Sequence, residues 1–207
     1  MRERFSHIYA TNEWEHGSGE GSLPVHTRGY AAFLQDFIRR HDVRSVVDLG
    51  CGDWQFSRHL DWSGVQYLGL DIVPAVIDAN TRAFARPNIQ FRLHDGDIAN
   101  LPAADLLIVK DVLQHWSNAA IQRLLPQLSR YPQALITNCV NPAGDTVNTD
   151  IADGDFRYLD LRLEPFQLAA TEVYSFTNKR GLFNRLWGRP RWLKKVLLVA
   201  GSPRPAR

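Results

Sequence analysis

Short apolar segments alternate with amphipathic segments along most of the chain. Five apolar runs are typical of buried strands, and they lie at 45–49, 66–70, 89–93, 105–109 and 133–138. Apolar positions recur at helical spacing over 26–40, 73–84 and 119–125, and a further helix is expected to begin at 53 or 54. Strands that alternate with helices in this way predict a parallel sheet covered on both faces.

The two ends of the chain depart from this alternation. Residues 1–25 are rich in Gly, Ser and Glu and are expected to be mostly irregular. Near the other end, residues 171–176 alternate as an antiparallel strand does, and 195–199 are expected to pair with them as a hairpin. The predicted class is therefore α/β, with a Rossmann-like, seven-stranded, mostly parallel sheet, flanking helices and an antiparallel hairpin at the C-terminal end.

The turn after the first predicted strand has a distinctive pattern of glycines and acids. Gly50 and Gly52 let the chain turn sharply and let a ligand approach the backbone closely. Asp48 precedes these glycines, and Asp71 ends the next strand, nineteen residues after Gly52. A carboxylate at that position accepts hydrogen bonds from ribose hydroxyls in folds of this kind. The pattern therefore predicts a cofactor that contains a nucleoside.

Two classes of cofactor fit such a turn, a dinucleotide and S-adenosylmethionine (SAM). The dinucleotide fingerprint has a third glycine where this chain has Gln55. Asp53 is expected at the start of the following helix, where its carboxylate would repel a pyrophosphate. SAM has no phosphate, and its sulfonium and ammonium groups tolerate neighbouring acids. The sequence favours SAM, with an NAD-dependent oxidoreductase or epimerase as the rival enzyme.

Four segments, in this order, resemble the successive motifs of class I SAM-dependent methyltransferases: 48–52, 70–72, 95–98 and 105–115. With their flanking strands they extend the resemblance over roughly residues 40–200. Residues 8–27 and 110–116 resemble a bacterial subgroup associated with glycans and secondary metabolites. The resemblance implies a methyltransferase domain over 31–207, preceded by a segment, 1–30, that folds over the cofactor as a lid.

The resemblance also implies which residues hold SAM. Nine positions are expected to contact it: Asp48, Gly50, Cys51, Gly52, Asp71, Ile72, Asp95, Gly96 and Lys110. The glycine turn would pass beneath the methionine part, and the acid after the second strand would hold the ribose. Either Asp95 or Asp97 would contact the adenine. No metal is expected, because the His and Asp residues of these loops have no recognised ligand spacing.

Catalysis is expected near the end of the fourth strand. His115 is suited to accept a proton at neutral pH, since its unperturbed pKa is about 6.5, and Asp111 is the other candidate. Alternatively, Asp111 forms a buried ion pair and His115 packs beneath the loop. Asn138 and Arg157 are expected to contact the acceptor, although Arg157 is equally suited to pair with a neighbouring aspartate.

The distribution of charge bears on the acceptor. The 207 residues have a formal net charge of +2, but nine of the 24 Lys and Arg residues follow Glu172, after which no acid occurs. The rest of the chain has 22 acids against 15 basic residues. The basic C-terminal loop predicts contact with an anionic acceptor or a membrane surface, unless it is only a structural excursion. Nucleic acid is not favoured, because the acidic remainder offers no basic track.

The sequence as a whole predicts a SAM-dependent methyltransferase that acts on an oxygen or nitrogen of a small molecule or glycan. A catalytically silent SAM-binding partner subunit is the alternative. Only two cysteines are present, and the first residues are charged, which predicts a cytoplasmic protein. The sequence does not indicate the oligomeric state.

Overall fold

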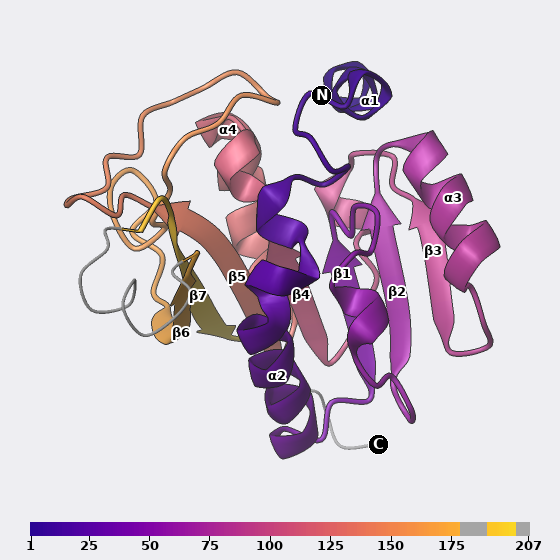
Figure 1. The fold of residues 1–207 in the computed structure, drawn as a ribbon. Helices are drawn as coiled ribbons and strands as arrows, with labels where there is room; N and C mark the ends of the chain where they lie inside the picture. Colours follow the sequence, from indigo (N-terminus) through magenta and orange to yellow (C-terminus); the bar gives the residue numbers. More distant parts are fainter. Residues whose placement is uncertain (179–189, 202–207) are drawn as a thin grey trace.

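The computed structural model describes residues 1–178 and 190–201, which form a seven-stranded sheet in the order β3-β2-β1-β4-β5-β7-β6 (Figure 1). The strands are β1 (Ser45–Leu49), β2 (Gln66–Asp71), β3 (Ile89–Leu93), β4 (Leu106–Lys110), β5 (Gln133–Val140), β6 (Thr171–Thr177) and β7 (Leu193–Ala200). Strand β7 runs antiparallel to both β5 and β6, and the other neighbours are parallel. The predicted fold class is confirmed.

The predicted helices over 26–40, 73–84 and 119–125 are present, and one helix was not expected. The α-helices of the described part are α1 (Arg2–Thr11), α2 (Pro24–Arg40), α3 (Pro74–Phe84) and α4 (Asn118–Leu124). The prediction of a mostly irregular start is wrong for α1, whose Phe5 and Ile8 lie one turn apart and are buried. None of these helices combines the length and the apolar character that a bilayer crossing requires.

The helix expected to begin at Asp53 or Trp54 is absent. Turns and a short 3-10 helix, η2 (Ser57–His59), follow β1 instead. Trp54 has a φ of 57°, in the left-handed region, and its ring packs among Tyr67, Phe84 and Phe91. Burial of this indole takes precedence over the helical backbone that the local sequence allows. Asp53 therefore does not lie at a helix N-terminus, and the dipole argument against a pyrophosphate was wrong in that respect.

The side chains of the central strands alternate between the two faces of the sheet. Leu106 and Ile108 pack with α2 on one face, whereas Leu107 and Val109 pack with α1 and α4 on the other. Figure 1 shows α2 and α4 on opposite sides of the sheet and α1 above the carboxyl ends of the central strands. Burial of each large aliphatic side chain contributes about 1.5–3 kcal/mol.

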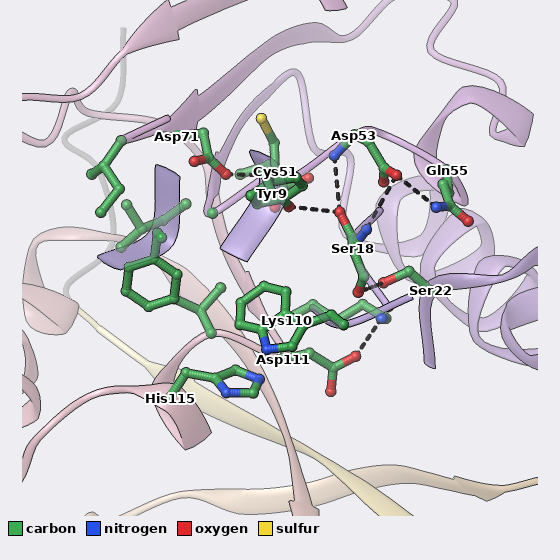
Figure 2. A pocket seen from close by; sticks show the side chains of 18 of the residues that line it. Tyr9, Ser18, Ser22, Cys51, Asp53, Gln55, Asp71, Lys110, Asp111 and His115 are labelled. Atoms are coloured by element: carbon green, nitrogen blue, oxygen red, sulfur yellow. Dashed lines mark hydrogen bonds and ion pairs between the residues drawn. The ribbon is translucent and has the colours of Figure 1, made fainter. Parts of the chain in front are cut away.

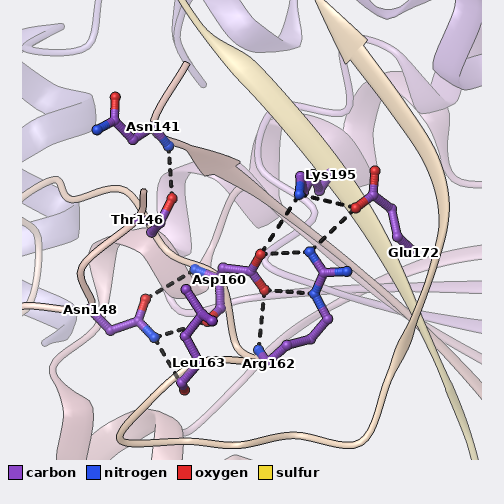
Figure 3. A network of polar contacts seen from close by, with 8 residues as sticks. All are labelled: Asn141, Thr146, Asn148, Asp160, Arg162, Leu163, Glu172 and Lys195. Carbon is purple, nitrogen blue, oxygen red and sulfur yellow. Dashed lines mark hydrogen bonds and ion pairs between the residues drawn. The ribbon is translucent and has the colours of Figure 1, made fainter. Parts of the chain in front are cut away.

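The connection from β5 to β6, residues 141–170, is tied to the sheet by polar contacts (Figure 3). The Asp160 carboxylate accepts hydrogen bonds from the Arg162 guanidinium, which also pairs with Glu172 on β6 at 3.3 Å. Lys195 on β7 lies 3.1 Å from the same Glu172 carboxylate. The Asn148 side chain bonds to the backbone of Asp160 in both directions. This long loop therefore holds a defined position at the carboxyl edge of the sheet.

Candidate active site

A cavity lies where β1, β2 and β4 end, beneath the N-terminal segment, defined here as residues 1–23 (Figure 2). Gly50 and Gly52 form its floor with φ values of 74° and 53°, which side chains other than glycine rarely adopt. A Cβ at Gly50 would collide with Val112, and one at Gly52 would collide with the Ser18 hydroxyl. Glycine is thus required at both positions for the turn to pack against Val112 and Ser18 beside the cavity.

Two buried carboxylates line this cavity at the ends of neighbouring strands. Asp71 accepts hydrogen bonds from the backbone N–H of Gly52 at 3.1 Å and of Val73 at 3.0 Å. Asp48 accepts one from the Tyr67 hydroxyl at 2.6 Å. Burial raises the pKa of both carboxyls to about 6, because the low-dielectric interior disfavours the charged form. Near neutral pH both are therefore ionised but close to their titration range.

The N-terminal segment is fastened over the cavity by one cluster of polar side chains (Figure 2). The Ser18 hydroxyl pairs with Tyr9 Oη at 2.8 Å and accepts from the Asp53 N–H at 3.0 Å. The Asp53 carboxylate accepts in return from the Ser18 N–H at 3.2 Å and from Gln55 Nε2 at 2.6 Å. Asp53 is thus a fastening point for the segment, a role that its place in the glycine turn did not suggest.

Residues 1–23 cover the cavity in this structure, and the lid over 1–30 stays a prediction. Phe5, Tyr9, Trp14, Ser18 and Ser22 line the cavity. Helix α2, by contrast, begins at Pro24, so residues 24–30 belong to a helix that packs on the sheet.

A three-residue ionic cluster lies at the end of β4. Lys110 Nζ and Lys194 Nζ each lie 2.5 Å from the same oxygen of Asp111, and the Gly21 carbonyl accepts from both. Burial alone would raise the pKa of Asp111, but the two ammonium groups outweigh it and hold this pKa at about 2. The other carboxylate oxygen, Oδ1, is buried without a hydrogen-bond partner in the described structure. Asp111 itself has a φ of 59°.

His115 has a defined tautomer. The Gln114 side-chain oxygen accepts from the Cys139 N–H at 2.8 Å, which turns the Gln114 amide nitrogen towards His115 Nε2, 3.3 Å away. Nδ1 of His115 lies 2.9 Å from the Asp155 carbonyl oxygen. Nδ1 therefore carries the proton and Nε2 presents a lone pair. Burial lowers the pKa of His115, so the ring is neutral at pH 7.

A second cavity, of about 330 Å³, adjoins the first on the side of β7. Four residues line both cavities: Trp14, Ser18, Asp111 and His115. Aromatic side chains from three separate parts of the chain surround the second cavity, and these are Trp14, Phe156, Tyr158 and Trp192. The Trp14 ring lies against His115, with 4.7 Å between ring centroids. The two spaces therefore meet at the ionic cluster and the histidine.

Some predicted site residues lie elsewhere. The cofactor candidates Asp48, Gly50, Cys51, Gly52, Asp71, Ile72 and Lys110 line the first cavity. Asp95 and Gly96 are exposed and do not line it, and the Asp95 carboxylate accepts hydrogen bonds from the Asp97 N–H and the Asn100 side chain. Asn138 is buried and lines neither of these two cavities. The adenine contact thus stays a prediction.

Arg157 is engaged in contacts within the protein, and its contact with the acceptor stays a prediction. Its guanidinium donates to the Asn118 side chain and to the carbonyls of Thr149 and Trp116, at 2.5–2.7 Å. It lines neither cavity. The ion pair with a neighbouring aspartate is not formed either, because these neutral oxygens occupy the guanidinium. Arg157 therefore braces the loop that carries Phe156 and Tyr158.

Two contributors to the site were missed in the sequence. Lys194 belongs to β7 and reaches Asp111 only because β7 pairs with β5, which no local pattern reveals. A lysine within an apolar strand was the available signal. Gln114 precedes His115 directly, and its role depends on the Cys139 backbone.

Residues 46–133 match a family model described as a methyltransferase domain. A comparison with curated proteins found no match. Similar solved structures include magnesium protoporphyrin IX methyltransferase from Synechocystis with bound SAH, at 15% identity and a TM-score of 0.58, covering 97% of this chain and 94% of that one. The methyltransferase domain of bacterial CtHen1 has 15% identity and a TM-score of 0.57, and the match covers 84% of this chain and 97% of that one.

Coclaurine N-methyltransferase bound to N-methylheliamine and SAH is also similar, at 13% identity and a TM-score of 0.54, covering 81% of this chain and 70% of that one. At such identities the likeness shows the fold. The sheet and these neighbours agree in the class I methyltransferase fold, and the family model matches residues 46–133 within it.

Proposed function

We propose that this chain, a methyltransferase domain with the class I fold, binds SAM in the first cavity and methylates an oxygen or nitrogen of an acceptor held in the second. The meeting of the two cavities at Asp111 and His115 is the observation that carries this proposal. A methyl transfer needs donor and acceptor in contact and aligned, and adjoining cavities provide that arrangement. The same feature favours an enzyme over a silent SAM-binding subunit.

The residues of the first cavity suit SAM in their charge and shape. Asp48 and Asp71 offer carboxylates to an ammonium and to ribose hydroxyls, and the glycine turn allows close approach. Cys51 is a small, buried member of the turn, and burial raises the pKa of its thiol well above the usual range, so no thiolate chemistry is proposed. Bound SAM supplies a methyl group that its sulfonium already activates.

His115 is the better of the two candidate bases. Its neutral ring lies beside both cavities, and its Nε2 lone pair accepts from the Gln114 amide, a neutral donor that an acceptor O–H can replace. The Asp111 carboxyl, by contrast, has a pKa of about 2 and shares one oxygen between two ammonium groups. A carboxylate stabilised in this way is a weak proton acceptor. We assign to His115 the removal of the acceptor proton and to Asp111 the orientation of neighbouring groups.

The acceptor is proposed to be a small molecule or a glycan. Contact of the basic C-terminal loop with an anionic acceptor or membrane surface also stays a proposal, because most of that loop, 179–189, lies outside the described residues. A cytoplasmic location is proposed on the sequence alone.

Titration calorimetry with SAM, SAH (SAM without its methyl group) and NADH tests the cofactor. We expect micromolar binding of SAM and SAH and far weaker binding of NADH, since four aspartates line the cavity and would repel a pyrophosphate. Comparable NADH binding would overturn the assignment. A screen for products labelled from methyl-labelled SAM then tests catalysis, and the silent-subunit alternative would be favoured if SAM bound but no product formed.

A further inference from the structure

We infer, on the basis of the proposed methyl transfer, that the acceptor is a flat aromatic molecule and that the methylated atom is an acidic oxygen, a phenol or carboxylic acid, placed beside Lys194. This inference narrows the acceptor in two respects. It selects oxygen over nitrogen, and it selects an aromatic ring over a sugar. The preference for an acidic oxygen follows from the charges around Lys194, and the preference for an aromatic ring follows from the side chains of the cavity wall.

The point where the cavities meet has an excess of positive charge. Two ammonium groups, of Lys110 and Lys194, share the single carboxylate of Asp111, and all three side chains are largely buried. His115 is neutral, and burial raises the pKa of the Cys139 thiol to about 12. Asp48 offsets the charge of Lys110 from the side of the first cavity, so the excess lies on the side of the second cavity, which Lys194 and Arg191 line. Buried charges are normally balanced, so an anion is expected here.

The methyl donor does not supply that anion. SAM carries a sulfonium, an ammonium and a carboxylate, a net charge of +1 at neutral pH, and the carboxylates of Asp48 and Asp71 in the first cavity balance that charge. Glu20, the remaining acid of the second cavity, lies 3.2 Å from His26 Nε2. A protonated amine would therefore be repelled at the point of transfer, whereas an oxyanion would be stabilised. Acidic oxygens are the acceptors that this electrostatic environment favours.

The wall of the second cavity is suited to a ring with flat faces. Trp14, Phe156, Tyr158 and Trp192 line it, and Phe156 is 52% exposed at its surface. Phe156 lies 5.8 Å from His115 and 5.5 Å from Tyr158, measured between ring centroids. Stacking and edge contacts of such side chains stabilise a bound aromatic ring.

Two polar side chains of the same wall, Gln114 and Ser18, are already engaged within the protein. Both ends of the Gln114 amide are engaged, with Cys139 N–H and His115 Nε2, and the Ser18 hydroxyl is bonded to Tyr9 and the Asp53 N–H. A sugar ring presents several hydroxyls that each need a partner when buried. With its four aromatic side chains, the described wall presents more apolar than polar surface, which favours an aromatic acceptor over a glycan.

The reaction follows from these positions. A phenol O–H takes the place of the Gln114 N–H at His115 Nε2 and gives its proton to that nitrogen, whereas a carboxylic acid is already ionised at neutral pH. Lys194 stabilises the oxyanion in both cases. The oxygen forms a bond to the methyl carbon of SAM as the carbon–sulfur bond breaks, and the sulfur keeps the electron pair. The products are the methyl ether or ester and SAH, together with, for a phenol, a protonated His115, which returns its proton to water.

Binding of small probes to SAH-saturated protein tests both parts, with SAH binding measured first. Benzoate and benzamide differ in charge but little in shape, and benzoate and cyclohexanecarboxylate differ in aromaticity but not in charge. We expect benzoate to bind about tenfold more tightly than benzamide, as a charge-assisted contact does, and several-fold more tightly than cyclohexanecarboxylate. Lys194→Gln should remove the first preference, and Lys194→Arg should keep it.

Lys195→Gln is the matched control, since Lys195 is the next residue of β7 but pairs with Glu172 outside the cavities. It should leave both preferences intact. If SAH binds but benzamide equals benzoate, the oxyanion part is wrong; if cyclohexanecarboxylate equals benzoate, the aromatic part is wrong. Failure of SAH to bind would instead refute the proposed function. The comparisons on the unaltered chain decide the matter even if Lys194→Gln does not fold.

Discussion

Replacing Asp53 with Ala should loosen the N-terminal segment and weaken cofactor binding. The change removes the hydrogen bond from the Ser18 N–H at 3.2 Å and the bond from Gln55 at 2.6 Å, while the Asp53 N–H can still donate to Ser18 Oγ. A hydrogen bond to a charged group contributes about 1.5–3 kcal/mol. Because the site is partly exposed, we take the lower end of this range for the Ser18 contact that closes the segment.

A loss of about 1.4 kcal/mol lowers the closure equilibrium about tenfold. Apparent affinity falls in proportion to the population of the binding-competent state, so the Kd for SAH should rise by up to about tenfold. Titration calorimetry measures this Kd. Trypsin cleavage after Arg2 or Arg4, both in α1, reports opening of the segment, and it should be faster in Asp53→Ala and less strongly slowed by SAH.

The control is Asp61→Ala, which removes a carboxylate that accepts from the Ser63 N–H on an exposed turn away from the cavity. It should match the unaltered chain in both measurements. Ser18→Ala removes the reciprocal bond, so its effect and that of Asp53→Ala should not add in the double variant. An Asp53→Ala protein with unchanged SAH affinity and cleavage rate would refute the fastening role.

Three further results are expected. Asp71→Ala should weaken SAM binding about ten- to a hundredfold by removing bonds to the ribose, whereas Asp78→Ala, on the exposed side of α3, should not; equal affinities by calorimetry would contradict this assignment. His115→Ala should lower turnover about 10²- to 10⁴-fold with little change in the Kd for SAH, and an unchanged rate on the identified acceptor would leave His115 a packing residue. SAM affinity should fall as pH is lowered through about 6, because protonation of Asp48 and Asp71 removes the charges that receive the cofactor. The expected loss is about tenfold per carboxylate at pH 5. A SAM affinity that does not change between pH 8 and pH 5 would contradict this expectation.

The sequence predicts best the strands and helices that the alternation of apolar and amphipathic segments marks out by itself. Strands β1, β2 and β4 are short apolar runs bounded by turn residues, and each lies where the pattern puts it. The cofactor cavity follows from them, because Asp48, Gly50, Gly52 and Asp71 lie in or directly after strands that end at one edge of the sheet. Motifs tied to strand ends are predictable because the fold itself brings them together.

The parts that the sequence did not predict depend on distant contacts. Trp54 adopts a left-handed backbone because its indole fills a gap between β2, β3 and α3, and the local sequence does not contain that gap. Helix α1 has only a short apolar stripe, and its burial depends on the core beneath it. Lys194 meets Asp111 across 83 residues of chain. In each case tertiary packing outweighs local preference.

The ionic cluster at the end of β4 is better explained by chemistry than by stability. Asp111 has a φ of 59°, and a non-glycine residue held in that region costs about 1–3 kcal/mol. Burying two ammonium groups and a carboxylate adds a desolvation cost that their attraction often does not recover, so apolar residues of similar volume would make an equally stable or more stable core. A cluster that is costly in both its backbone and its charges, and that lies where two cavities meet, is expected to be retained for what it does there. Its geometry offers an ammonium to the second cavity through Lys194 while Asp111 keeps that ammonium in place, and this is the arrangement that the proposed methylation of an acidic oxygen requires.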